Sequence, residues 1–581
     1  MENTVIEIPF HLKQYIAKQD YSLYTPIDHA SWRYIMRVSK EFFKEHAHPK
    51  YLDGLNETGV TVERIPRISE MDQKLQKFGW RAVIVTGFIP PEPFLEMLAN
   101  RILPIAADMR KLENIDYTPS PDIVHEAAGH APILSDPDYS SYLKKFGEIS
   151  RKVIFAKEDN DLYEAILDLS ETKENPQATE TDINRAQNKL DQAIANVGYV
   201  SEAQQVTRLG WWSTEYGLFQ QEGKFLIYGA GLLSSIGESY NCLSNKVKKI
   251  PLTIECIETS YDITKPQPQL FVTDNFKKLE AVIDQLSEKM AYKQGGIVSL
   301  DKAKKAQTVT TTVLNTGIQV SGILEDYRIN NKGAVYFLKY KGASQLSVDG
   351  IQVIGHGADY HKEGFSSPIG GIKGLAHKPW LASNEDWHQI GCQQGAQCQF
   401  EFESGIRVEG LWKSSLKINN NTLILSFENC TSTLGNEVLF SPTWGTFDII
   451  LGESIISVFG GASDRDAYSK HVQTKEFHPR AQKSNLTDEN QELGTLYSSI
   501  REIREQGQMN GEFLDKILRV KSRLDAAYPQ DWLLRLEILE ILTRHQLRKT
   551  ICDELKIKLL ELASESERME MLIRRGFALV N

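Results

Sequence analysis

The chain has 581 residues, of which 41% are hydrophobic and 25% charged, as in ordinary soluble globular proteins. Lysine and arginine total 66 against 77 aspartates and glutamates, and the resulting net charge of −11 argues against a nucleic-acid partner. The N-terminus lacks the apolar core of a secretory signal, and no run of about 18 apolar residues could span a membrane. Six cysteines without a C-x-x-C pair argue against a disulfide framework, so we expect a cytoplasmic protein of several domains.

The first region, residues 1–299, is predicted to be mostly helical. Apolar residues recur at near-helical spacing over 29–45, a β-like run occupies 80–88, and the helical pattern resumes at 94–103. Residues 156–205 are polar and rich in glutamate, asparagine and glutamine. That composition predicts a helical insertion on the surface of the first domain.

The second region, residues 300–470, changes to β-branched, aromatic and often alternating segments separated by turn signals. The segment GIQVSGIL (317–324) resembles GIRVEGLW (405–412), at an offset of 88 residues. We therefore expect one β unit, duplicated into a single sandwich or barrel. The segment HGADYH (356–361) contains two histidines but no third ligand at a meaningful spacing, and we interpret it as a loop. Cys392 and Cys398 are predicted to be two buried small side chains rather than a bridge.

The third region, residues 471–581, consists of a polar linker followed by helical periodicity. Pro529 interrupts this periodicity, so two or more helices are predicted. The fold class that we predict is multidomain: a mainly α first domain, then a β-rich sandwich or barrel domain, then a C-terminal helical segment.

The strongest local signal for chemistry is SPDIVHEAAGH (120–130). Its histidines, His125 and His130, are five residues apart, whereas zinc peptidases use H-E-x-x-H with histidines four apart. Five residues on a regular α-helix turn by about 140°, so the rings diverge unless the helix ends there. Gly129 and Pro132 can supply that end, and Pro121 after a serine is typical of a helix start. We therefore predict a helix terminus that delivers two imidazoles to one point.

Two histidines need a third ligand, and a carboxylate is the natural candidate. Two histidines and one carboxylate form the ligand set of non-haem Fe(II) oxygenases. The alternative, on spacing alone, is that His125 and His130 only form hydrogen bonds in the core or at the surface.

Three segments in order carry a family resemblance: TPSPDIVHEAAGH (118–130), WWSTEYGL (211–218) and YGAGLLSSIGE (228–238). Together they resemble the pterin-dependent aromatic amino acid hydroxylases, over roughly residues 10–295. The resemblance implies a helical basket with a small sheet, and Fe(II), tetrahydrobiopterin (a reduced pterin) and O2 as reactants. It also implies that His125, His130 and Glu215 are the catalytic iron ligands.

The resemblance further implies residues for the substrate and for the pterin. Arg110 would bind the carboxylate of the amino acid, and Asp122 would orient that arginine. The remaining residues expected on the substrate side are Thr118, Trp211 and Ser234, of which Ser234 would also orient His125. The residues expected on the pterin side are Gly87, Ile89, Phe94 and Glu126. Gly210 stands where the animal enzymes carry a tyrosine.

The function expected from this resemblance is hydroxylation of the ring of a free aromatic amino acid, with L-phenylalanine to L-tyrosine, a step of phenylalanine catabolism, as the first choice. A tyrosine or tryptophan hydroxylase is the first alternative. A non-catalytic binding or regulatory module that retains the hydroxylase fold is the second. Residues 300–581 carry no resemblance, and we expect that a homo-oligomer could form through this half.

Overall fold

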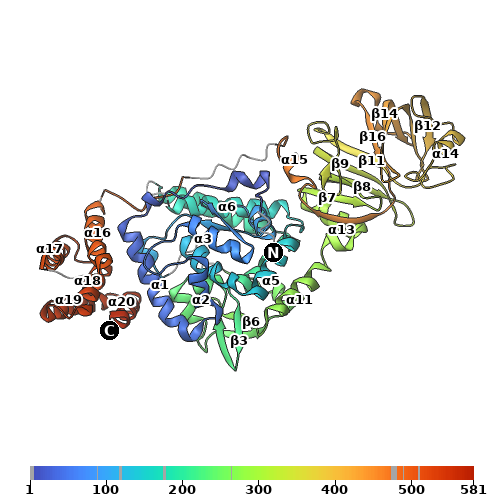
Figure 1. Ribbon diagram of the computed structural model, residues 1–581. Coiled ribbons are helices and arrows are strands. Elements are labelled where there is room, and N and C mark those ends of the chain that lie inside the picture. The colour runs from blue at the N-terminus through green and yellow to red at the C-terminus, as the bar shows by residue number, and fades with distance from the viewer. Residues whose placement is uncertain are drawn as a thin grey trace.

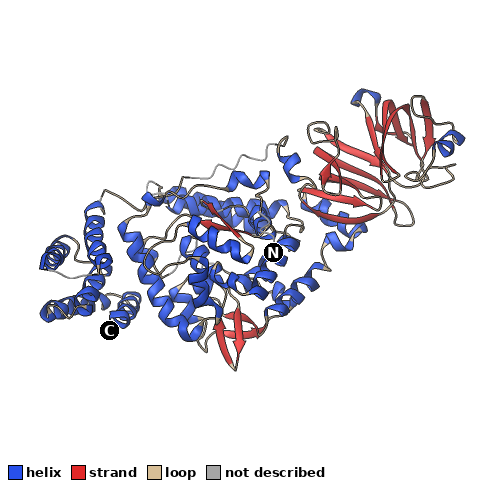
Figure 2. Cartoon of the chain, in the orientation of Figure 1, coloured by secondary structure: helices blue, strands red, loops and turns tan. Residues whose placement is uncertain are grey.

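The structure is a computed structural model that describes residues 6–87, 89–116, 121–174, 178–262, 265–472, 481–488, 490–507 and 511–580. Three regions follow one another along the chain: a mostly helical region, a β-rich region and a set of C-terminal helices (Figure 1). The β-rich region and the C-terminal helices lie at opposite ends of the helical region (Figure 2).

The first region is built around α1 (Pro26–His46). A capping box begins this helix, since the side chain of Thr25 accepts from the backbone of Asp28 and the Asp28 carboxylate accepts in return. The other helices of the region are α2 (Lys50–Thr58), α3 (Ile68–Leu75), α4 (Pro91–Ala99), α5 (Pro137–Ser150), α6 (Lys157–Glu174), α7 (Glu180–Asn196), α8 (Glu202–Gly210), α9 (Ala230–Leu233), α10 (Ile236–Asn241), α11 (Phe276–Ser287), α12 (Ala291–Gln294) and α13 (Gly296–Ala306).

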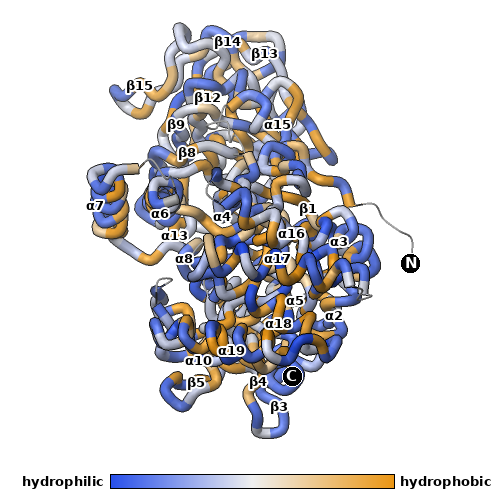
Figure 3. The backbone as a smooth tube through the Cα atoms, turned by 90° about the vertical axis from the view of Figure 1, so that its left-hand side faces the viewer, coloured by the Kyte–Doolittle hydropathy of each residue, from blue (hydrophilic) through white to orange (hydrophobic). Residues whose placement is uncertain are grey.

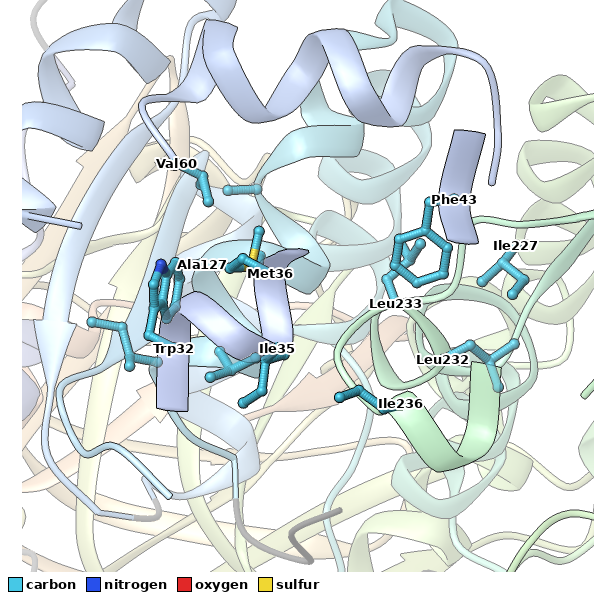
Figure 4. Packing of buried hydrophobic residues seen from close by; sticks show 14 of the residues in the cluster. Trp32, Ile35, Met36, Phe43, Val60, Ala127, Ile227, Leu232, Leu233 and Ile236 are labelled. Atoms are coloured by element: carbon cyan, nitrogen blue, oxygen red, sulfur yellow. The ribbon is translucent and has the colours of Figure 1, made fainter. Parts of the chain in front are cut away.

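The apolar face of α1 forms part of the main core. Trp32, Met36 and Phe43 are at most 2% exposed, and they belong to one cluster with Leu233 of α9 and with Ala127, which lies between the two histidines (Figure 4). Core packing therefore extends directly to the segment that carries His125 and His130.

Two small sheets complete the first region. Strands β1 (Arg81–Val85) and β2 (Ile102–Ala106) pair in parallel, and α4 connects them. The second sheet has the order β4-β3-β6-β5, and its strands are β3 (Leu218–Gln221), β4 (Lys224–Ile227), β5 (Lys248–Pro251) and β6 (Gln269–Thr273). The β-like run at 80–88 contains β1, as expected.

The polar stretch 156–205 contains the packed helices α6 and α7. Ala186 is the buried residue of α7, and the other described residues of this helix are at least partly exposed. Figure 3 shows α7 standing out from the side of the molecule. Its polar composition follows from this exposure.

The β-rich region contains the predicted duplication. Strands β7 to β10 pair in order and β11 pairs with β9, while β12 to β15 pair in the same order and β16 pairs with β14. In both copies the repeated glycine, Gly322 or Gly410, lies at a β-bulge where an added Cβ would come within 3 Å of the neighbouring strand. The strands are β7 (Val309–Leu314), β8 (Ile318–Ile329), β9 (Val335–Val348), β10 (Ile351–Gln352), β11 (Gly364–Pro368), β12 (Gln397–Glu401), β13 (Ile406–Ile418), β14 (Asn421–Leu434), β15 (Glu437–Phe440), β16 (Phe447–Ile450) and β17 (Ile455–Gly460).

The two copies form two sheets, of six and five strands, and not the single closed barrel that was one of the two expected forms. Each copy returns its fifth strand to its own third strand, so each copy folds on itself instead of sharing one sheet. The sheets meet where the backbone N–H of Ile450 donates to Ser367 Oγ at 3.0 Å. Two short helices belong to this region, α14 (Asn384–Gln389) and α15 (Arg465–Ser469).

The C-terminal helices pack on α1. Arg33 of α1 donates to both carboxylate oxygens of Glu540, at 2.8 and 2.7 Å, and the Tyr34 hydroxyl donates to the Leu572 carbonyl at 2.6 Å. Apolar residues of these helices belong to the same core cluster as α1. The helices are α16 (Gln491–Gln506), α17 (Gly511–Ala527), α18 (Leu533–Arg544), α19 (Lys549–Ala563) and α20 (Glu567–Val580).

All six cysteines are free and buried, which confirms the prediction for Cys392 and Cys398. Among the helices that the structure describes, none has the length and apolar character needed to cross a bilayer.

Candidate active site

The two parallel strands open toward the site at their carboxyl ends. Gly87, in the left-handed region at φ +68°, follows β1, and Arg110 follows β2. A hydrogen bond from the Ala107 N–H to the Val85 carbonyl at 2.9 Å keeps the two exits adjacent. Carboxyl ends of parallel strands are where open sheets place ligands, so both residues leave the sheet at its functional edge.

The segment Val124–His130 is a helix that ends at His130, as predicted, but it is a π-helix, which was not predicted. In a π-helix the hydrogen bonds run from residue i to i+5, so side chains five apart lie one above the other. The backbone N–H of His125 donates to the Asp122 carboxylate at 3.0 Å, so Asp122 caps this segment. Pro121 precedes the helix, and Ser120 lies outside the described residues.

A second π-helix, Trp211–Glu215, brings the carboxylate to the two histidines. The Nε2 atoms of His125 and His130 are 3.2 Å apart, and oxygens of Glu215 lie 3.3 and 3.1 Å from them, respectively. Burial alone would raise the pKa of Glu215, but the charges of the two histidines outweigh it and lower that pKa. Three lone-pair donors at these separations fit one face of the coordination sphere of a divalent metal ion.

The ring of His125 is held by Ser234. Its Nδ1 lies 3.0 Å from Ser234 Oγ, and that hydroxyl donates to the Ala230 carbonyl at 2.8 Å. The hydroxyl is therefore left to accept from Nδ1–H, which frees the Nε2 lone pair for a metal. Gly129 lets α9 approach this closely, since an added Cβ would stand 2.7 Å from the same carbonyl oxygen.

Arg110 and Asp122 form a buried bidentate pair. Arg110 Nε donates to Oδ2 at 2.7 Å and Nη2 to Oδ1 at 2.8 Å, while Nη1 donates to the Ser234 carbonyl at 3.1 Å. Both side chains are at most 5% exposed. A guanidinium has five N–H donors, so this set of bonds leaves donors for the carboxylate of a ligand. Thr118, expected beside them, lies outside the described residues.

Trp211 stacks on two tyrosines that sequence reasoning missed. Its ring centroid lies 4.4 Å from that of Tyr216 and 4.2 Å from that of Tyr261. Tyr216 lies inside the segment WWSTEYGL (211–218), whereas no sequence pattern marked Tyr261. Trp212 is fully buried and donates to the Thr259 carbonyl at 2.8 Å, so it belongs to the core.

The residues expected on the pterin side lie in different surroundings. Phe94 is half-buried in the first turn of α4, whereas Ile89 is packed in a small apolar cluster with Val83 and Met97. Glu126 is 5% exposed, and its Oε2 has no hydrogen-bond partner among the described residues. Burial raises the pKa of this carboxyl to about 8. The carboxyl is thus available to a polar ligand or water.

Gly210 lies against the core. An added Cβ would stand 3.0 Å from the ring tip of Phe146, so a larger side chain at this position would require Phe146 to shift.

Comparison with known proteins gives one family. The family model described as "Biopterin-dependent aromatic amino acid hydroxylase" matches residues 4–159 and 181–328. The phenylalanine-4-hydroxylase of Mesorhizobium japonicum is 29% identical over 265 residues, which cover 45% of this chain and 80% of the relative. That of Pseudomonas aeruginosa is 29% identical over 272 residues, or 46% of this chain and 87% of the relative.

Solved structures of a bacterial relative also match. The Chromobacterium violaceum phenylalanine hydroxylase with bound oxidised Fe(III) has 26% identity and a TM-score of 0.37, with 47% of this chain and 86% of that chain covered. The structure of the same enzyme with iron(III) and 7,8-dihydrobiopterin has 26% identity and a TM-score of 0.37, with 48% and 88% covered. The gap in the family match, 160–180, falls within α6 and the start of α7.

Proposed function

This chain belongs to the biopterin-dependent aromatic amino acid hydroxylase family, and on that premise we propose that it hydroxylates the ring of free L-phenylalanine to give L-tyrosine, using Fe(II), tetrahydrobiopterin and O2. The choice of phenylalanine is supported by relatives that carry the name phenylalanine-4-hydroxylase. Tyrosine or tryptophan as the preferred substrate is the alternative that a competition assay would reveal.

The observation that carries the proposal is the convergence of His125, His130 and Glu215. Their donor atoms lie 3.1–3.3 Å apart, and one imidazole is held by Ser234 with its Nε2 lone pair toward the others. Bound there, Fe(II) would supply the oxygen chemistry of the reaction. The role of the chain is to hold the three ligands on one face and leave the opposite positions open.

Arg110 is the residue that would bind the carboxylate of the amino acid. It is held in one orientation by Asp122, so little rotamer entropy is lost when the substrate binds. Trp211 would line the pocket of the substrate ring, while Ser234 holds both the His125 ring and, through its carbonyl, Arg110. Thr118 remains a prediction for the same pocket.

The pterin would bind beside the carboxyl end of β1. Gly87 turns the chain there through a left-handed conformation, and Phe94 offers a half-buried ring for stacking. Glu126 would bond to the pterin, directly or through water, because its Oε2 has no hydrogen-bond partner among the described residues. Ile89 would act only through its backbone, since its side chain packs in an apolar cluster.

The division into residues 1–299, 300–470 and 471–581 is proposed to be the domain division, with the first as the catalytic part. The C-terminal helices share a core with α1, so we propose that they stabilise the catalytic part within one chain. A homo-oligomer through this half and a cytoplasmic location stay predictions, and mass measurement of the purified protein in solution checks the first.

The test is turnover of the purified chain with Fe(II), tetrahydrobiopterin, O2 and the three aromatic amino acids in competition. We expect tyrosine from phenylalanine, no product from Glu215→Ala, and full activity from Glu41→Ala, which changes an exposed glutamate of α1. Fastest turnover of tryptophan would refute the substrate. Absence of both product and stoichiometric iron in the wild type would favour the non-catalytic module.

A further inference from the structure

The β-rich region contains a second cluster of potential metal ligands, far from the first in the sequence. The loop between β10 and β11 carries His356 and His361, and β16 carries Asp448. His356 Nδ1 lies 3.3 Å from His361 Nε2, and Asp448 Oδ2 lies 3.9 and 4.0 Å from these two nitrogens. The histidine pair that we interpreted as a simple loop therefore has a third ligand, 87 residues further along the chain.

The three atoms are spaced to surround one ion. Atoms at these separations enclose a point that lies about 2.2 Å from each of them, at the upper end of the roughly 2.0–2.2 Å range of zinc–nitrogen and zinc–oxygen bonds. At the candidate active site the three donor atoms are closer together, at 3.1–3.3 Å.

The carboxylate is buried and has no hydrogen bond on the side that faces the histidines. The side chain of Asp448 is 2% exposed, its Oδ1 accepts from Ser426 Oγ at 2.6 Å, and its Oδ2 has no hydrogen-bond partner in the described part of the chain. The Tyr360 hydroxyl is a further polar group that interacts with this carboxylate. An unpaired buried carboxylate oxygen is costly, and a bound cation would remove that cost.

Both histidines lie on a loop that is fixed to a neighbouring strand. Backbone hydrogen bonds hold the loop in place: the Leu346 N–H donates to the His356 carbonyl at 2.9 Å and the Ser344 N–H to the His361 carbonyl at 3.0 Å. The ligands are thus positioned by β9 before any ion binds.

We propose that His356, His361 and Asp448 bind one divalent transition-metal ion, with Zn²⁺ as the class that the two imidazoles and one carboxylate fit. The histidines come from the first copy of the duplicated β unit and Asp448 from the second. The ion therefore links the two sheets through its ligands. This site is separate from the catalytic one, and its existence does not depend on the hydroxylase activity.

The test is titration of Zn²⁺ alone into the full-length, chelator-treated chain with a competing metal dye. His130→Ala/Glu215→Ala serves as the background, because it removes two ligands of the first site. We expect this variant to bind one equivalent of Zn²⁺. Adding Asp448→Asn should weaken binding more than about 100-fold, since even loss of a residue that only supports a ligand costs 10–100-fold.

A matched control is His377→Ala in the same background, because His377 pairs with an aspartate of the same region but its side chain is 64% exposed. We expect it to leave Zn²⁺ affinity unchanged. Thermal unfolding followed with and without Zn²⁺ provides a second readout: the ion should raise Tm in the background variant and not after Asp448→Asn. No bound Zn²⁺ in the background variant, or equal affinity with and without Asp448→Asn, would overturn the proposal.

Discussion

Replacing Asp122 by asparagine tests the role of the buried pair most directly. The two carboxylate oxygens accept four hydrogen bonds, three from Arg110 and one from the backbone of His125, at 2.7–3.0 Å. The amide of asparagine would point an NH2 group at two of these donors and would remove the charge. Breaking a buried pair in this way costs about 3–5 kcal/mol of folding free energy.

The same change should weaken substrate binding, because Arg110 loses the partner that fixes its orientation. Hydrogen bonds to charged groups contribute about 1.5–3 kcal/mol, so KM for phenylalanine should rise roughly 10- to 100-fold. The assay is steady-state kinetics under saturating pterin, with iron content measured on the same sample. We expect kcat and bound iron to change far less than KM, since the three proposed metal ligands remain.

Asp72→Asn is the matched control. Asp72 also accepts from an arginine, Arg81 Nε at 2.7 Å, and from a backbone N–H, that of Ala82 at 2.8 Å. Loss of this pair should lower stability without raising KM. The reasoning would be refuted if folded Asp122→Asn kept KM within twofold of the wild type, or if both variants raised KM equally.

Three further predictions concern the supports of the fold and the site. Glu540→Ala should lower the free energy of unfolding by about 3–5 kcal/mol, because it takes a carboxylate partner from the buried Arg33 and from the partly buried Arg37 of α1. A urea midpoint equal to the wild type would contradict this. Burial alone would raise the pKa of Glu96, but Arg465 and His11 together outweigh it and lower the pKa to about 2. Because this folded-state pKa is depressed, ionised Glu96 contributes about 3 kcal/mol to the free energy of unfolding. This contribution is complete above about pH 4.5 and is lost as the pH falls toward 2. The stability difference between the wild type and Glu96→Gln should therefore shrink over that range in urea titrations, and a constant difference would speak against the pair. Gly129→Ala should lose stoichiometric iron in elemental analysis, because its Cβ would collide with α9, whereas Gly198→Ala, where an added Cβ meets nothing within 4 Å, should retain it.

The sequence by itself determined the local structure and the chemical class of this protein. Helical and alternating periodicities reflect which face of each segment is buried, so they can be recognised in the sequence before the fold is known. The duplicated β unit was visible because its bulge glycines recur at one offset. The iron ligands were proposed from three motifs, two of which coincide with the two π-helices.

Tertiary structure alone decided how distant segments meet. His125 and His130 converge because the backbone between them is π-helical. The residue types around them are equally compatible with the end of an α-helix, so the sequence could not distinguish the two. Asp448 joins His356 and His361 across two sheets, and a ligand set assembled from separate strands has no local spacing to detect. The docking of α18 on α1 likewise depends on buried pairs such as Arg33–Glu540, whose members are 507 residues apart. Periodicity reports that a face is buried, whereas only the packed chain shows which face it is buried against.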